Sequence, residues 1–312
     1  MNYKYFKIAL LAVVFITTNA LAQNQKDNTN TESSSVQRSN IQTYTPSVLL
    51  NKGQWDIKFF NNLYTETKAT FDGVEAEKLR ENYLTSTIEV FTGVSDSKRF
   101  NLGVIVELRS NTIAGKDAFY VFNLGTDDFS RKGITSIAPS IKWQPIESIG
   151  KFSVQSSINI PLVKRETVAG VFLDEAAWNL QNRFFYDYTF SSGKWQLFSE
   201  INTQYFFGDK EVATFDALGR KTTSEGSFAT NTFILNPGLF LSYFPSDKST
   251  VLGFVQHSNR FGDFTQDFTA LGFGGKYQLT DALNLEVLYS KFVRGNNTGL
   301  GQSFNMGLRV LF

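Results

Sequence analysis

One short motif in the chain has the residue types for hydrolytic chemistry. His257, Ser258 and Asn259 stand together near the end of an expected strand, and a His that takes the proton of a Ser hydroxyl makes that Ser a nucleophile. Both side chains must then lie on one face, within hydrogen-bond reach. Neighbouring residues of a strand point to opposite faces unless a β-bulge intervenes. His257 and Ser258 are therefore a weak candidate pair, and we predict no catalytic residues.

Metal and cofactor chemistry has as little support. The chain has no Cys and one His, which excludes thiolate and multi-His metal sites, Fe–S clusters and Cys nucleophiles. The acidic pairs Asp127–Asp128 and Asp174–Glu175 offer Ca²⁺ ligands, but solvated loop charge is the preferred interpretation. No helix follows the glycines at 272–275, so they are not a phosphate loop and are expected to mark strand kinks or close backbone approach. We predict neither a cofactor nor a metal.

The composition favours strands over helices. The 312 residues include 31 Phe, 12 Tyr and 4 Trp, yet the mean hydropathy is only −0.18. Aromatic residues that alternate with polar ones are typical of strands. The 30 basic and 29 acidic residues nearly balance, which leaves no electrostatic signature for a nucleic-acid partner.

The N-terminus is predicted to direct export. Residues 1–22 combine Lys4 and Lys7, an apolar run over 8–16, and the small-x-small site Ala20-Leu21-Ala22, as in a secretory signal peptide. The alternative, a membrane anchor, needs about 20 apolar residues. Residues 23–46 have almost no large apolar side chains and are predicted to be a polar, disordered periplasmic leader. The remaining 47–312 form the expected barrel domain.

Period-2 alternation recurs from Gly53 onward, and it predicts about twelve strands. Tight turns and longer polar connections then alternate along the chain, the long ones near 66–82, 111–132, 162–177 and 209–229. A transmembrane β-barrel has this alternation of short periplasmic turns and long outside loops, whereas a secreted β-sandwich has no reason for it. The expected strands are 54–65, 83–94, 100–110, 134–145, 152–161, 178–190, 195–208, 230–244, 250–258, 266–279, 283–294 and 303–312.

Each strand has one apolar and one polar face, as Phe304, Met306 and Leu308 against Asn305 and Arg309 illustrate. This pattern alone fits a sandwich core as well as a lipid-facing barrel wall. Aromatic residues near strand ends favour the barrel, because amphipathic rings settle at the membrane interface. They are Trp55, Tyr83, Trp143, Trp178, Trp195, Tyr243 and Tyr277. We therefore predict an all-β, transmembrane, up-and-down antiparallel β-barrel of about twelve strands in the cell outer membrane, surrounded by its lipid.

The polar face of such a barrel lines its lumen, and its charges have both signs. A ring of one sign would indicate ion selectivity, and none is evident. Mixed charges can instead pair across the lumen. The charged residues predicted to line the pore are Lys58, Glu89, Glu107, Arg109, Lys142, Arg183, Asp187, Glu200, Lys276, Glu286 and Arg309, and the polar ones include Asn62, Gln155, Asn159, Gln204 and Asn236.

Several segments carry a resemblance to known families. The segments 157–162, 236–244 and 271–312 resemble outer-membrane barrels of the meta-pathway of phenol degradation family, which implies transport of small, often hydrophobic molecules. The final strand ends in Phe312, similar to the C-terminal signal that the outer-membrane assembly machinery reads. The composition resembles exported proteins of the Bacteroidota. His257-Ser258-Asn259 is similar in placement to the motif of outer-membrane phospholipase A and lipid A deacylases.

Two functions remain open on the sequence. The first is a passive channel or transporter for a small-molecule solute, with no cofactor. The second is a barrel closed by its own charge pairs that serves as an accessory or structural subunit of an outer-membrane complex. A rim lipid hydrolase is a third, disfavoured by the spacing of His257 and Ser258. An open or a blocked lumen separates the first two.

Overall fold

A computed structural model of the chain describes residues 45–97, 99–123, 125, 127–208, 213–215, 217–219, 221–223 and 230–312. These residues belong to one compact unit, Val36–Phe312. The predicted signal peptide (1–22) and nearly all of the predicted leader (23–46) lie outside the described residues.

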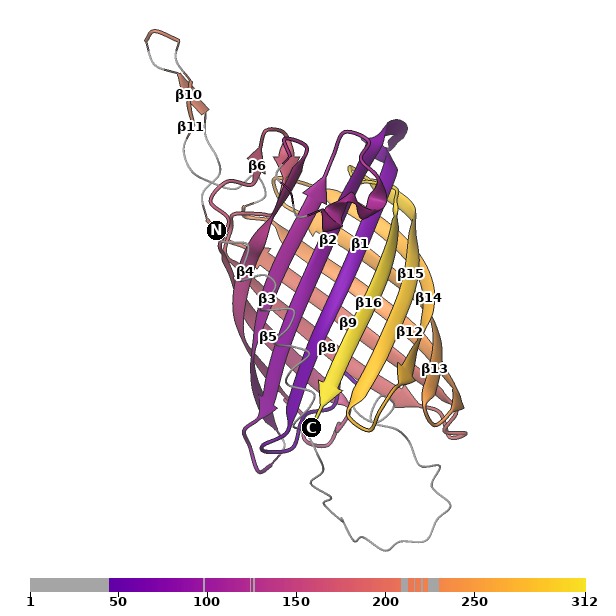
Figure 1. Cartoon of the computed structure of the whole chain (residues 1–312). Helices are drawn as coiled ribbons and strands as arrows, with labels where there is room; N and C mark the ends of the chain where they lie inside the picture. The colour runs from indigo at the N-terminus through magenta and orange to yellow at the C-terminus, as the bar shows by residue number, and fades with distance from the viewer. Residues whose placement is uncertain are drawn as a thin grey trace, which may run out of the picture. The chain divides into compact units, whose positions relative to one another are not determined.

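Twelve strands of the described part form one closed antiparallel β-barrel (Figure 1). Each strand pairs with its neighbours in chain order, and β16 returns to pair with β1 from Asp56–Leu311 to Thr65–Gln302. This confirms the predicted all-β, up-and-down barrel. The strands are β1 (Trp55–Phe71), β2 (Val74–Gly93), β3 (Phe100–Thr112), β4 (Ser130–Trp143), β5 (Phe152–Pro161), β8 (Asn179–Thr189), β9 (Trp195–Phe206), β12 (Phe233–Ser246), β13 (Ser249–Phe261), β14 (Gln266–Gln278), β15 (Leu283–Asn296) and β16 (Gln302–Leu311).

One predicted connection is wrong. Residues 66–82 were expected to form a long loop, but β1 and β2 run through them and meet at a two-residue turn. Asp72 and Gly73 have φ of 49° and 81°, the positive values that a tight hairpin turn requires. Lys68 pairs with Glu75 across the hairpin at 2.7 Å. Polar residues occupy both faces of this extension, so the alternation that marks a half-buried strand is missing there.

The two ends of the barrel differ in their connections. The end that carries Trp55 and Phe312 has short turns, and we call it the turn end; the opposite end, with the longer connections, is the loop end (Figure 1). The smaller elements lie in loop-end connections: the 3₁₀ helix η2 (Ala118–Phe122) and the two-residue strands β6 (Thr167–Val168) and β7 (Val171–Phe172). Strands β10 (Ala213–Phe215) and β11 (Lys221–Thr223) form a further hairpin. Among the described residues, no helix is long and apolar enough to span a membrane.

The connection between β3 and β4 folds back onto the outer wall of the barrel. Val121 of η2 packs in one buried cluster with Leu63 of β1 and Leu84 of β2. The carboxylate of Asp127 holds this loop by accepting from the Phe129 amide at 2.7 Å, the Tyr120 hydroxyl at 2.7 Å and Lys116 at 3.0 Å. These donors, the Phe129 amide above all, lower the pKa of Asp127 to about 2. Asp127 was expected to be a solvated loop charge, but its carboxylate holds the loop in place.

Candidate functional site: the barrel lumen

Two cavities occupy the barrel interior. The larger, of about 650 Å³, is here called the wide cavity, and the smaller, of about 380 Å³, the loop cavity because loop residues Phe172–Ala177 contribute to its wall. Thr87, Glu89 and Arg183 line both. The boundary between the cavities is therefore made of side chains from β2 and β8.

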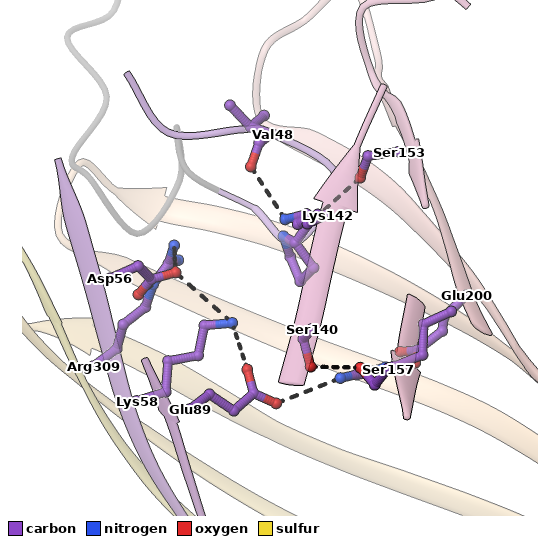
Figure 2. A network of polar contacts seen from close by, with 12 residues as sticks. Val48, Asp56, Lys58, Glu89, Ser140, Lys142, Ser153, Ser157, Glu200 and Arg309 are labelled. Atoms are coloured by element: carbon purple, nitrogen blue, oxygen red, sulfur yellow. Dashed lines mark hydrogen bonds and ion pairs between the residues drawn. The ribbon is translucent and has the colours of Figure 1, made fainter. Parts of the chain in front are cut away.

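A chain of charges crosses the lumen at this boundary, and we call it the charged bar (Figure 2). It begins on β16, where Arg309 Nε lies 2.7 Å from Asp56 Oδ1. Lys58 Nζ lies 3.8 Å from Asp56 Oδ2 and 3.0 Å from Glu89 Oε2. Arg183 Nη1 of β8 then contacts Glu89 Oε1 at 3.5 Å, and its Nε contacts Glu200 Oε1 of β9 at 2.7 Å. The bar links five strands.

Charges of opposite sign alternate along the charged bar. Asp56 and Glu89 each lie between two cations, and Arg183 lies between two carboxylates. Side chains of the bar are only 8% to 26% exposed. Removing one partner of a buried ion pair costs about 3–5 kcal/mol, since the other charge stays uncompensated. The contact between Glu89 and Arg183 lies where the two cavities meet, since both residues line both cavities.

The structure places the predicted pore residues as follows. Two of them, Asp187 and Asn236, line neither cavity. The hydroxyls of Thr45 and Ser47 donate to the carboxylate of Asp187 and cover it. Asn62 and Gln155 line the wide cavity, and Asn159 and Gln204 the loop cavity. The charged residues that line the wide cavity are Lys58, Glu89, Lys142, Arg183, Glu200, Lys276, Glu286 and Arg309, and those of the loop cavity are Glu89, Glu107, Arg109 and Arg183.

The lumen also holds an array of aromatic rings that the sequence analysis missed, since it assigned aromatic residues to the outer wall and its girdles. Tyr83 in particular was predicted for a girdle, but it lines the wide cavity. Stacked or tilted ring contacts link Phe185, Phe198, Phe240 and Phe254 in one series, with centroids 5.1 to 6.1 Å apart. Tyr83, Tyr64, Phe292 and Phe268 form a second series, at 4.1 to 6.1 Å. The lumen is therefore amphipathic.

A signal for these rings was present in the sequence. Phe59–Phe60 and Phe184–Phe185 are adjacent pairs, and two neighbours in a strand must face opposite sides. Phe60 and Phe185 share parity with Lys58 and Arg183, and all four line the wide cavity. Trp55, Trp178, Trp195 and Tyr277 are 42% to 50% exposed on the outer wall.

Glycines let some of the rings lie flat against the barrel wall. A Cβ at Gly272 would stand 2.2 Å from Cζ of Phe254, and one at Gly307 would stand 2.2 Å from Cε1 of Phe60. Each glycine is paired with that aromatic residue on the neighbouring strand. The close approach expected at Gly272 is thus an approach of the Phe254 ring and of the Tyr289 carbonyl.

Gly272→Ala is predicted to narrow the wide cavity. The new methyl group would force the Phe254 ring inward, at a cost of about 1–3 kcal/mol for overpacking, and ion conductance through the barrel should fall. Single-channel recording and urea unfolding in liposomes measure the two effects. Gly253→Ala is the matched control, since a Cβ there would meet nothing nearer than 3.8 Å. Equal behaviour of both variants would contradict the assignment.

The segment Thr45–Gln54 packs into the lumen at the turn end. Leu50, 2% exposed, lies in a buried cluster with Phe91, Ile105, Ala138 and Leu311. Lys142 donates to the Val48 carbonyl at 3.2 Å and Ser153 to the Pro46 carbonyl at 3.4 Å (Figure 2). Of the predicted leader, the described residues Thr45 and Pro46 thus contact the wide cavity.

A loop closes part of the other end. Asp174 lies 3.1 Å from Arg109 of β3, and Glu175 lies 2.5 Å from Arg260 of β13. Asn111 adds hydrogen bonds to the carbonyls of Phe172 and Leu173. Burial raises the pKa of Glu175 against the lowering effect of Arg260. The expectation of solvated charge at Asp174–Glu175 is wrong, because inward-facing arginines draw both carboxylates into the lumen.

The structure does not bring the candidate catalytic pair His257 and Ser258 together. His257 pairs with Thr269 and Ser258 with Phe268 in a regular register, so the two side chains lie on opposite faces. His257 contacts the Thr269 hydroxyl and the Asn259 amide, each at 2.9 Å. In the part of the chain that the structure describes, no group of three or more His, Cys, Asp or Glu is arranged to hold a metal ion.

Comparisons with known proteins give a likeness of fold. No protein-family model and no curated protein sequence matches the chain. The COG4313 outer-membrane channel from Pseudomonas putida F1 matches with a TM-score of 0.63 and 10% identity, over 86% of this chain and 98% of that one. The β domain of the Bordetella autotransporter BrkA matches with a TM-score of 0.56 and 11% identity, over 84% and 100%. The barrel is thus of the outer-membrane type.

Proposed function

We propose that the protein is an outer-membrane β-barrel that acts as a passive channel for small molecules. The observation that carries the proposal is the hollow interior: two cavities lie in one barrel and are separated by side chains, above all by the contact between Glu89 and Arg183. Side chains can rearrange on a short timescale, so a side-chain boundary can open without a change of fold. The similarity in fold to the Pseudomonas putida channel supports the same function.

The outer wall supports a membrane location. Outward residues such as Val251, Phe273 and Met306 are 56%, 64% and 54% exposed, and exposed apolar side chains on every strand are expected where lipid is the solvent. The proposal includes export by residues 1–22, insertion by the assembly machinery through the strand that ends at Phe312, and contact with outer-membrane lipid. It also includes the phenol meta-pathway family and a Bacteroidota-type source, for which sequence resemblance is the support.

Planar-bilayer recording and solute uptake by liposomes test the proposal with the purified full chain. We expect small conductance steps and uptake of a solute the size of one sugar ring, with little preference for cations or anions because most of the lumen charges are paired. Heat-denatured protein in the same liposomes is the control. A folded barrel that shows neither conductance nor uptake would refute an open pore.

The second candidate is a closed accessory barrel in an outer-membrane complex. The observation that favours it is that the charged bar, the Thr45–Gln54 segment and the Phe172–Ala177 loop each occupy the lumen. A closed barrel would co-purify with a partner in fixed stoichiometry and would not conduct. Conductance from protein that is free of any partner would argue for the channel instead.

A further inference from the structure

We propose that the wide cavity is a binding site for a small aromatic carboxylate, with the carboxylate at Lys142 and Gln155 and the ring beside Phe185. This inference rests on the proposed function, because it names the class of solute that the channel takes. It is carried by three features of the cavity wall. Among the described residues, these are a cation without an acidic partner, a buried amide nitrogen without a hydrogen bond, and a row of aromatic rings that begins beside them.

Lys142 differs from the other cations of the wide cavity. Lys58, Arg183, Lys276 and Arg309 each have a carboxylate within 4.0 Å. Among the described residues, Lys142 has none, although it is only 8% exposed. Its one hydrogen bond goes to the Val48 carbonyl at 3.2 Å. A lysine ammonium has three N–H donors, so two remain for a ligand, and a buried cation without a counter-charge favours an anion.

Gln155 supplies a second unused donor next to Lys142. The two residues are direct neighbours across β4 and β5, and Gln155 is in turn the neighbour of Arg183 on β8. Gln155 is 3% exposed, and its Nε2 has no hydrogen-bond partner in the part of the chain that the structure describes. A buried donor left unpaired is unfavourable. One carboxylate placed between Lys142 and Gln155 would satisfy both residues.

An aromatic body fits the wall beside these donors. Lys142 Nζ lies 5.5 Å from the centre of the Phe185 ring, and Arg183 Cζ lies 5.0 Å from it. The series continues from Phe185 through Phe198 and Phe240 to Phe254. Ring pairs in offset or edge-to-face contact attract each other beyond the effect of burial alone. A flat ring attached to the carboxylate would extend this series.

The unpaired donors and the aromatic rings together favour an aromatic carboxylate over other classes of small molecule. A hydrocarbon would leave Lys142 and Gln155 unpaired, and a simple inorganic anion would leave the rings unused. A dianion would meet the carboxylates of Glu89, Glu200 and Asp56, which already serve the charged bar in the same lumen. The volume of about 650 Å³ is within the range of small-molecule sites.

Benzoate is the probe, with benzyl alcohol as its neutral analogue and acetate as the anion without a ring. Calorimetry on the full chain in detergent should give tighter binding of benzoate than of either analogue. Lys142→Met should weaken benzoate binding at least about tenfold, the factor that equals 1.4 kcal/mol, and should leave benzyl alcohol unchanged. Gln155→Leu should weaken benzoate binding by a smaller factor. Heat-modifiable gel mobility shows that each variant is folded.

Lys276→Met is the matched control, because Lys276 lines the same cavity and carries the same charge but is paired with Glu286 at 2.7 Å. Equal loss of benzoate binding in both lysine variants would mean that the electrostatic potential of the whole lumen attracts benzoate, and it would overturn the site. Equal binding of benzoate and benzyl alcohol by the native protein would also overturn it. Conductance is measured on the same samples. A conducting protein that does not prefer benzoate refutes this inference and leaves the channel; a protein that binds benzoate through Lys142 without conducting refutes the channel and leaves the site.

Discussion

Arg183→Met is expected to join the two cavities, raise the conductance several-fold and make the barrel prefer cations. Arg183 is the residue that bridges β2 and β8 through Glu89, and it lines both cavities. Methionine lacks the guanidinium that contacts both Glu89 and Glu200, so the side chains at the boundary between the cavities lose the ion pairs that hold them together. Glu89 keeps Lys58 at 3.0 Å, but Glu200 loses its partner at 2.7 Å. The unpaired negative charge is the physical reason for the selectivity, and single-channel recording with a salt gradient measures it.

Two further variants separate the effect of lumen width on conductance from the effect of lumen charge. Arg183→Met combined with Glu200→Gln should keep the higher conductance and lose the cation preference, because the neutral amide restores the balance. Lys276→Met makes the same change in net charge at a pair away from the bar, so it should not raise the conductance. If Lys276→Met and Arg183→Met conduct equally, the charged bar is not the barrier.

Fold and site differ in how far they follow from the sequence. The twelve strands are predictable because each has one apolar and one polar face. The resulting alternation of residue types with a period of two does not depend on how the side chains pack. The strand extension between Glu66 and Glu81 is not predictable in this way, since both of its faces are polar, and only Asp72-Gly73 marks the turn. Parity also places Lys58, Glu89 and Arg183 on the inner wall, but it says nothing about which of them meet.

The contacts of the site depend on the size and closure of the barrel. Glu89 and Arg183 are 94 residues apart and belong to strands that are not neighbours, so their meeting follows from the curvature of a twelve-strand wall. The inward position of the aromatic rings is not predicted for another reason. Aromatic character by itself predicts the outer face, although Phe60 and Phe185 share the parity of inward charges. In this barrel parity decides the face, and hydrophobicity alone misassigns it.

Leu50→Asp is expected to release the Thr45–Gln54 segment and open the turn end of the lumen. Leu50 is 2% exposed and packs against Phe91, Ile105 and Leu311. Truncating a buried leucine typically costs about 2–5 kcal/mol, and an aspartate adds the cost of burying a charge. The other anchors of the segment include the carbonyl contacts of Val48 and Pro46 and the hydroxyls on Asp187. Backbone hydrogen bonds of Gly53 and Gln54 with Gly93, and the ion pair of Lys52 with Asp96, hold its last residues. Trypsin cleavage at Lys52 should become faster, and conductance should increase.

The segment and the charged bar would then act as barriers in series along one path. A solute that enters through the loop cavity passes the charged bar first and the Thr45–Gln54 segment second. Because the two resistances add, the larger one determines most of the total resistance. Leu50→Asp alone should therefore raise the conductance less than Arg183→Met alone, and the double variant should exceed the sum of the two increases. Val94→Asp, at a turn-end residue already 42% exposed, controls for added charge. Rapid cleavage at Lys52 without any further conductance in the double variant would show that solutes leave the wide cavity by another route.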